Sequence, residues 1–418
     1  MKNMKRILLY SFLALFSFLV SACQEKSNTI DYNIEYIKSV EVISPHAENV
    51  VFDNFAHFIS IDFPTNTNIT DVKMKLTLAP GVSMENPREE TSQYDLSKGA
   101  TFEIRYEERI ILFRIKSNFV VTPPDPNARG WEKKNDFGRL PPYLSVHKYT
   151  RKVEEKNVQA YIAIADMNDK EARFSVLGEA QGTQTPSHFF NNSNKPVVLL
   201  NGGYFWDGHS LGLIVRDGKT VNPAEAIVWR NYNGKSTAYY PTRGIFGLGY
   251  DGKFYANWAY QSDGKLFVYP SPAPNKAGEK PQDIPSDKFP PGAQQWTPKD
   301  AIGAGPVLIK NGESKNTWEN ELFDASSGIG PTINNPRSAV GYAPSGHLIF
   351  FVCEGRNKTP GTPGLTLQNV ADLLLDLGCT EALNLDGGGS SCMLINGKET
   401  IIPSDGNQRA ITSMVALY

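Results

Sequence analysis

Short runs of alternating apolar and polar residues fill the first third of the chain. The stretches HFISIDF (57–63) and KMKLTLAP (73–80) change character at nearly every residue, which is the pattern of half-buried β-strands. The stretch TFEIRYEERIILFRIKS (101–117) contains two such runs around Glu107-Glu108 and predicts a hairpin. Helical periodicity is nearly absent here, so we predict a small β-sandwich over residues 35–120, a usual size for a domain.

Longer apolar runs begin after residue 144. Residues 158–168, 172–180 and 195–205 are rich in β-branched and aromatic residues and predict further strands. No internal repeat is present. Together with the helical segment described next, these runs predict a second domain of mixed α/β or α+β class over residues 145–418, with strand–helix–strand units around a central sheet.

One segment of the second domain has a helical period. LTLQNVADLLLDLG (365–378) repeats its apolar residues at spacings of three and four, with Thr366 as the expected N-cap and Gly378 just beyond the C-terminal end. Apolar runs at 348–353 and 381–385 flank this helix and predict buried strands. A strand–helix–strand crossover normally joins parallel strands of one sheet.

The chain begins with a targeting segment. MKNMKR is basic, the next 14 residues are apolar and too few to span a membrane as a mature helix, and VSAC ends at Cys23. This arrangement resembles the signal peptide and lipidation site of bacterial lipoproteins. We therefore expect residues 1–22 to be removed, Cys23 to carry a lipid, and residues 23–34 to be a tether. The expected location is the cell envelope, at the outer membrane, and residues 121–144, rich in Pro, Gly and charge, predict a linker between the domains.

Charge and cysteine content narrow the function classes. Lys and Arg number 42 and Asp and Glu number 44, so no basic surplus points to nucleic acid. Three cysteines remain in the exported chain, and their pairing stays open. The six histidines and the cysteines have no metal-ligand spacing, so no metal or other cofactor is predicted, although a divalent cation is conceivable beside the acidic groups.

Two carboxylates follow the two strands that flank the predicted helix. Glu354 ends the first strand and Asp386 follows the second. If these strands run parallel, both side chains lie at one rim of the sheet, about 5 Å apart for neighbouring strands and roughly twice that if one strand intervenes. Arg337 and Arg356 lie close by in the sequence and suit phosphate oxygens, and Asn201 and Gly202 end another apolar run.

The stretch NLDGGGSS (384–391) places Gly387, Gly388 and Gly389 between Asp386 and Ser390. Successive amides in a glycine turn make a concave anion site that side chains would block. The stretch lacks the lysine of a P-loop and the second glycine of a nucleophile elbow. We therefore predict an anion-binding turn beside a carboxylate.

Six stretches in this order make the second domain resemble the phosphodiester glycosidase family. They are NGGYF (201–205), GAGPVLIKNG (303–312), NPRSAVGY (335–342), FVCEGR (351–356), GLTLQNVADLL (364–374) and NLDGGGSSCMLING (384–397). More loosely, the N-terminal domain resembles the Ig-like domains that precede many Bacteroidetes surface lipoproteins. Tyr204, where Phe is more usual, and Glu354, where relatives often have Asp, depart from the family pattern.

The resemblance implies hydrolysis of the bond between a sugar's anomeric carbon and a phosphodiester phosphate. It implies Asp386 and Glu354 as catalytic carboxylates that serve the sugar and water. It assigns substrate or phosphate binding to a further set of residues: Asn201, Gly202, Arg337, Arg356, Thr366, Gly387, Gly388, Gly389, Ser390 and Arg409. The expected partner is a sugar phosphodiester or phosphorylated glycan, with no nucleic acid and with membrane contact through the lipid anchor alone.

Several alternatives stay open at this point. The protein is a non-catalytic glycan-binding lipoprotein if the fold is used without turnover. It is a phosphodiesterase if the P–O bond is cut instead of the C–O bond. The sequence leaves open which sugar is released, which carboxylate is nucleophile or base, whether the anomeric configuration is retained, and the oligomeric state.

Overall fold

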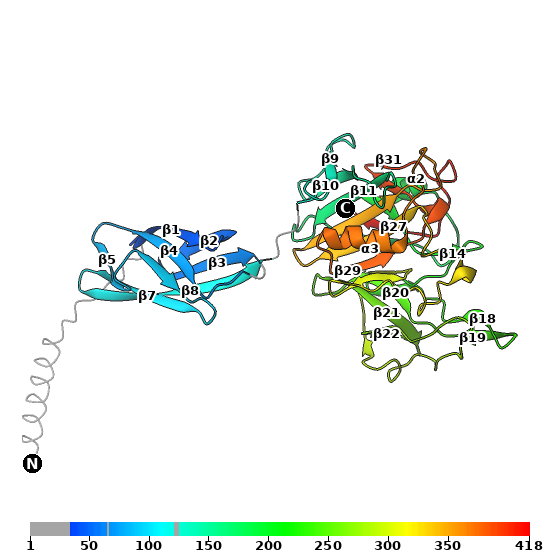
Figure 1. Cartoon of the computed structure of the whole chain (residues 1–418), viewed down its shortest axis with the longest axis horizontal. Coiled ribbons are helices and arrows are strands. Elements are labelled where there is room, and N and C mark those ends of the chain that lie inside the picture. The colour runs from blue at the N-terminus through cyan, green and yellow to red at the C-terminus, as the bar shows by residue number, and fades with distance from the viewer. Residues whose placement is uncertain (1–33, 65–66, 121–124) are drawn as a thin grey trace, which may run out of the picture. The chain divides into compact units, whose positions relative to one another are not determined.

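A computed structural model describes residues 34–64, 67–120 and 125–418 and divides the chain into two compact units, up to residue 122 and from residue 123 (Figure 1). The predicted signal segment, Cys23 and most of the tether lie outside the described residues. Within the described part, no helix is both long and apolar enough to cross a membrane.

The first unit consists of two β-sheets around one core. The sheets have the orders β1-β4-β6 and β2-β3-β8-β7-β5, and apolar side chains from both, such as Ile61, Met74 and Phe113, share the interior. The hairpin predicted around Glu107-Glu108 is confirmed, since β7 and β8 pair across that turn. The strands are β1 (Ile37–Ser44), β2 (Asn49–Asp53), β3 (Phe58–Pro64), β4 (Val72–Leu78), β5 (Val82–Asn86), β6 (Thr91–Tyr94), β7 (Ala100–Tyr106) and β8 (Arg109–Val120).

The second unit contains three larger sheets. In order across the sheet, the eight-stranded sheet comprises β26 (Glu313–Ser314), β25 (Val307–Lys310), β29 (Glu381–Asn384), β27 (Arg337–Ala343), β28 (His347–Cys353), β11 (Ala160–Asp166), β10 (Leu144–Tyr149) and β9 (Trp131–Lys134). The seven-stranded sheet comprises β17 (Lys219–Asn222), β16 (Ile214–Arg216), β24 (Asp300–Gly303), β20 (Arg243–Leu248), β21 (Phe254–Ser262), β22 (Lys265–Tyr269) and β23 (Gln294–Gln295). The five-stranded sheet comprises β12 (Phe174–Gly178), β32 (Ser413–Leu417), β13 (Val198–Asn201), β30 (Met393–Ile395) and β31 (Lys398–Glu399).

One hydrophobic core joins these three sheets. Leu383 of the eight-stranded sheet, Phe246 of the seven-stranded sheet and Val415 of the five-stranded sheet are buried in the same cluster. Two separate hairpins complete the strands: β14 (Phe205–Trp206) with β15 (His209–Ser210), and β18 (Val228–Tyr232) with β19 (Lys235–Tyr239).

The predicted α/β class of this unit is wrong. All its described strand pairs are antiparallel, and its described α-helices are the short α2 (Pro186–Asn192) and α3 (Leu367–Asp376). The helix predicted between two strands is α3, with Thr366 as its N-cap in a capping box. It covers one face of the eight-stranded sheet (Figure 1). The strands on either side, β28 and β29, run in the same direction but are separated by β27, which is antiparallel to both.

Asn-Gly and Asp-Gly turns explain why the unit is built from hairpins. Residues 207–208, 217–218, 233–234, 263–264, 311–312 and 396–397 each join two paired strands, and both residues of every pair have positive φ. Turns with two positive φ values match the twist of antiparallel strands and favour these dipeptides. These six dipeptides are a sequence signal for antiparallel strands.

The predicted linker also needs correction. Within residues 121–144, β9 pairs with β10 at the edge of the eight-stranded sheet. Trp131 of β9 is fully buried against Tyr149, with ring centroids 4.8 Å apart. This segment therefore belongs to the second unit.

Candidate active site

Asp386 is held where two glycine-rich stretches of the chain meet in space. Its main-chain N–H donates to the carbonyl of Gly202 (3.0 Å), and its carbonyl accepts from the Asn201 side chain (2.7 Å). Neither Gly202 nor Gly203 has room for a Cβ atom, which would meet Ser413 or the Gly303 carbonyl. The stretches NGGYF and NLDGGGSS thus form one structural unit that fixes Asp386.

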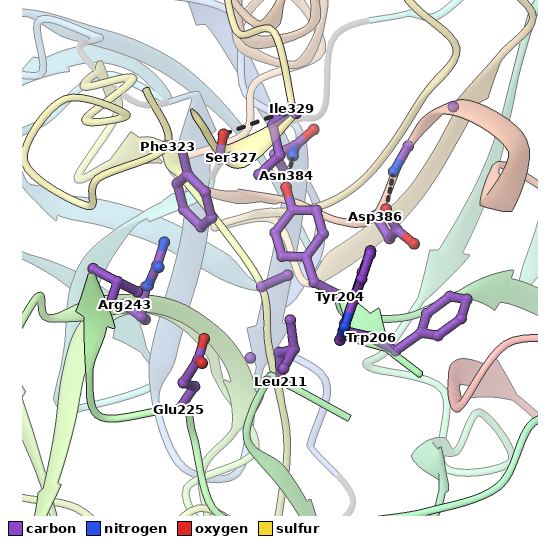
Figure 2. Close-up of a pocket in the computed structure, with 18 of the residues that line it drawn as sticks. Tyr204, Trp206, Leu211, Glu225, Arg243, Phe323, Ser327, Ile329, Asn384 and Asp386 are labelled. Carbon is purple, nitrogen blue, oxygen red and sulfur yellow. Dashed lines mark hydrogen bonds between the residues drawn. The ribbon is translucent and has the colours of Figure 1, made fainter. Parts of the chain in front are cut away.

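Asp386 faces a cavity of about 750 Å³, a volume typical of small-molecule sites. The ends of β29 and β20, the β14–β15 hairpin, β18 and the loop after Phe323 contribute to its walls (Figure 2). Trp206 and Trp229, with 77% and 62% of their surface exposed, lie along its lining. Carboxylates, arginines and aromatic rings therefore share one concave surface.

The glycine turn is largely self-satisfied, which corrects the predicted anion nest. The N–H of Gly387 donates to the Asp386 carboxylate (2.8 Å), and that of Gly388 to the Pro336 carbonyl (3.0 Å). Residues 388–390 form a short 3₁₀ turn in which Ser390 N–H also has an internal acceptor. Among the first three turn amides, that of Gly389 alone has no acceptor in the described part of the chain.

The glycines instead make room for two arginines. A Cβ on Gly388, which has φ of +58°, would lie 2.8 Å from Nη2 of Arg356. A Cβ on Gly389 would collide with the side chains of Arg409 and Asp405. Both guanidinium groups thus lie directly against the turn, and both residues line the cavity.

Arg356 and Arg409 share the carboxylate of Asp405. Nε and Nη2 of Arg409 donate to Asp405 Oδ2 (2.9 and 2.6 Å), while Arg356 Nη1 lies 3.9 Å from Oδ1. Arg409 also donates from Nη1 to the Ser390 hydroxyl (3.4 Å). Two guanidinium groups thus share the Asp405 carboxylate beside the turn, an arrangement that suits an anionic ligand.

The carboxyl group of Asp386 is electrostatically perturbed. Burial raises its pKa to about 6, while hydrogen bonds from Ser390 and Gly387 and the positive charge of Arg409 act in the opposite direction. A carboxyl group that titrates near neutral pH in a cavity is a catalytic candidate when its geometry agrees.

Arg337, predicted to bind phosphate, uses most of its donors within the protein. It is 2% exposed, and Nε, Nη1 and Nη2 make four hydrogen bonds to main-chain carbonyls. The acceptors are Leu365 (3.0 Å), Ile329 (3.0 Å), Gly330 (2.5 Å) and Ile333 (2.7 Å). Because a guanidinium has five N–H donors, one remains, and the side chain organises the loop that walls the cavity.

Three other predicted binding residues have structural roles. Asn201 is fully buried, and besides Asp386 its amide contacts Ser338 (2.6 Å) and the N–H of Cys392 (3.1 Å). Gly202 packs against Ser413, and Thr366 caps α3. The cavity lining includes none of these three residues.

Glu354 is likewise absent from the cavity lining. It is 6% exposed, and Oε1 accepts from the N–H of Ile402 (3.0 Å), while Oε2 is buried without a partner in the described residues. This bond ties the loop that carries Arg356 to the loop that carries Asp405. The predicted pairing of Glu354 with Asp386 across one cleft is therefore not what the structure contains.

Sequence reasoning missed the opposite wall of the cavity. Arg243, Glu225 and Phe323 line it, and Tyr204 separates them from Asp386 (Figure 2). The Tyr204 hydroxyl donates to the Gly305 carbonyl (2.6 Å) and accepts from Asn384 (2.9 Å). Arg243 begins a strand without any recognisable motif, so no local signal marks it.

The structure tests two further features of the sequence. No group of three or more His, Cys, Asp or Glu that suits a metal ion occurs within the described residues. Cys353, Cys379 and Cys392 are all free and buried, and burial raises the pKa of each thiol, to about 12 for Cys353. These thiols are core residues without nucleophilic character.

Comparisons with known proteins identify the family of the second unit. The profile of the phosphodiester glycosidase family matches residues 194–418. The chain is 33% identical to human N-acetylglucosamine-1-phosphodiester alpha-N-acetylglucosaminidase over 105 residues, 23% of this chain and 20% of that protein. It is 22% identical to the uncharacterized SPbeta prophage-derived protein YomE of Bacillus subtilis over 284 residues, 66% of this chain and 38% of that protein. The chain thus spans about two fifths or less of these curated relatives.

Among solved structures, the chain is similar to the zebrafish N-acetylglucosamine-1-phosphodiester alpha-N-acetylglucosaminidase catalytic domain, which is auto-inhibited by its pro-peptide. That match has 22% identity and a TM-score of 0.46 and covers 66% of this chain and 84% of the zebrafish chain. A hypothetical protein from Synechocystis matches with 16% identity and a TM-score of 0.47, over 83% of this chain and 74% of its own.

Proposed function

The chain belongs to the phosphodiester glycosidase family, and from this premise we propose that it hydrolyses the bond between a sugar's anomeric carbon and a phosphodiester phosphate. One observation carries the proposal: Asp386, whose pKa is raised by burial, lies at a glycine turn against which Arg356 and Arg409 pack, all within one cavity. A carboxylate beside two cations suits the two charges that such a reaction develops.

The reaction separates positive and negative charge. As the C–O bond breaks, positive charge grows on the anomeric carbon, and the ionised carboxylate of Asp386 stabilises it. The electron pair leaves with the phosphate oxygen, and Arg356 and Arg409 stabilise the resulting phosphate monoester. Because that leaving group is already a stable anion, no general acid is required. Water supplies the new oxygen on the sugar and releases one proton.

Hydrolysis in ¹⁸O-labelled water tests the proposal. A panel of sugar-1-phosphodiesters is incubated with the purified protein, and the sugar and phosphate products are analysed by mass spectrometry. We expect the label in the sugar, because the C–O bond is cut. Label in the phosphate would instead identify a P–O phosphodiesterase, and binding of the panel without turnover would identify a glycan-binding protein.

The pH dependence of kcat/KM should follow the ionisation of Asp386. Because burial raises its pKa to about 6, the carboxylate is protonated below this pH, and kcat/KM should fall about tenfold per pH unit on the acidic side. Arg409→Gln removes a positive charge that lowers this pKa, so the acidic limb should move to higher pH. Arg409→Lys keeps the charge and serves as the control. A limb at the same pH in wild type and Arg409→Gln would contradict the role of Asp386.

We further propose that the reaction takes place at the cell envelope on a phosphorylated glycan. The support is the N-terminal segment that ends in Cys23, which lies outside the described residues. Radiolabelled palmitate incorporation, lost on Cys23→Ser, would verify the anchor.

A further inference from the structure

The wall of the cavity opposite the glycine turn contains an arginine whose guanidinium has no hydrogen-bond or ion-pair partner among the described residues. Arg243 lines the cavity, and its side chain makes no hydrogen bond or ion pair within the described residues. Its Nη1 is buried without a hydrogen-bond partner in the described part of the chain. The other arginines of the lining have partners. Arg230 pairs with Asp324, and Arg337 donates to main-chain carbonyls. Arg356 and Arg409 share Asp405. A partly buried guanidinium without hydrogen-bond partners destabilises the fold unless a ligand accepts its hydrogen bonds.

The guanidinium is held in a fixed orientation. Its carbon lies 4.2 Å from the centroid of the Phe323 ring, a cation–π distance, and Phe323 in turn lies 5.4 Å from the Tyr204 ring. Figure 2 shows Phe323 and Tyr204 between Arg243 and Asp386. The Phe323 and Tyr204 rings thus line the part of the cavity between Asp386 and Arg243.

The charge around Arg243 indicates a neutral ligand. Glu225, on the same wall, and Glu321, buried behind it, both stabilise the positive charge of Arg243. The Glu321 carboxylate accepts hydrogen bonds from the main-chain N–H groups of Gly244 (2.7 Å) and Val307 (2.8 Å). The Glu225 carboxylate has no hydrogen-bond partner among the described residues. A second anionic group would be repelled by Glu225. Hydroxyl groups suit the pair, because each one accepts from an arginine and donates to a carboxylate.

Building on the proposed function, we propose that Arg243 and Glu225 bind the hydroxyl groups of the released sugar that are remote from its anomeric carbon. The cavity then has two ends. The glycine turn with Arg356 and Arg409 takes the phosphate, and the Arg243 wall selects a neutral pyranose by its hydroxyl pattern. Arg243 and Glu225 are thus specificity-determining residues of the reaction.

A substrate-by-variant comparison tests this subsite. Monodeoxy analogues of a cleaved sugar-1-phosphodiester are assayed with wild type, Arg243→Met and Glu225→Gln, and with Arg216→Met, outside the cavity lining, as the control. In wild type and the control, at least one deoxy position should lower kcat/KM by ~10-fold or more, as when a buried polar group loses its partner. The same deoxygenation should cost less than about threefold in the two cavity variants, because the partner is already missing.

Two outcomes overturn the proposal. Equal deoxy penalties in wild type and both variants would show that Arg243 and Glu225 contact no sugar hydroxyl. An unchanged deoxy profile together with lost inhibition by inorganic phosphate in Arg243→Met would place Arg243 at the phosphate. Unfolding temperatures are measured for each variant, and Glu225→Gln, at an exposed position, provides the test if Arg243→Met fails to fold.

Binding of free sugars separates this inference from the proposed function. Saturation-transfer NMR with methyl pyranosides of neutral hexoses and N-acetylhexosamines requires no turnover. Binding that Arg243→Met abolishes would support the subsite even if no phosphodiester is cleaved. Binding that is equal in wild type and Arg243→Met would refute it even if cleavage occurs.

Discussion

Replacing Asp386 by asparagine is expected to lower kcat for a sugar-1-phosphodiester by at least ~10³-fold, the order of loss seen when a group that acts in the transition state is removed. Asparagine retains an oxygen that accepts the Gly387 N–H, and the main-chain bonds to Asn201 and Gly202 are unaffected. The variant should therefore fold and bind substrate. Turnover is measured by phosphate-monoester release, and folding by the unfolding temperature.

Glu354→Gln is the matched control for this result. The glutamine oxygen can still accept from Ile402, and the side chain lies outside the cavity lining, so turnover should fall far less than in Asp386→Asn. Comparable losses in the two variants, with intact folding, would restore Glu354 as a second catalytic carboxylate. Unchanged turnover in Asp386→Asn would remove the proposed mechanism.

The separation of Glu354 from Asp386 follows from the faces to which the two strand ends lead. Val352 and Leu385 are buried in the same core cluster. Side chains alternate between the two faces of a sheet, so Glu354, two residues after Val352, continues the side of Val352. Asp386, one residue after Leu385, continues the opposite side. Because β28 and β29 run in the same direction, both carboxylates lie at the same edge of the sheet. They do not face each other, because they lie on opposite sides of it.

Patterns of neighbouring residues predicted local structure well. They did not predict which distant segments pack together. The helical period with Thr366 predicted α3 and its N-cap, because both depend on neighbouring residues. The partners of Arg356 and Arg409 depend on Asp405 and on the glycine turn, which come together only in the folded chain. The role of Arg243 is still harder to predict, because its contact with the Phe323 ring joins segments 80 residues apart and neither segment carries a motif.

The glycine turn illustrates the same limit. From the sequence, three glycines beside an aspartate predict main-chain amides open to an anion. In the structure the turn uses the amides of Gly387 and Gly388 itself, and the absent Cβ atoms accommodate the guanidinium groups of Arg356 and Arg409. The predicted chemistry, anion binding beside a carboxylate, still suits the turn, but side-chain cations and not the main chain supply most of the positive charge.

Arg337→Met is expected to destabilise the second unit by ~3 kcal/mol or more, because four buried carbonyls lose their donor and each unsatisfied acceptor costs about 1–3 kcal/mol before the loop relaxes. Calorimetry of the full chain should show the transition of the second unit shifted down by several degrees. Arg356→Met, in contrast, removes a side chain that is 51% exposed and should leave that transition in place while raising KM or lowering kcat. Arg337→Met could instead leave the transition unchanged and weaken inhibition by inorganic phosphate. That outcome would show that Arg337 binds the phosphate, as predicted from the sequence. It would also show that its carbonyl contacts do not stabilise the loop. The unfolding temperature and the kinetic constants thus distinguish the two arginines: Arg337→Met changes the first, and Arg356→Met changes the second.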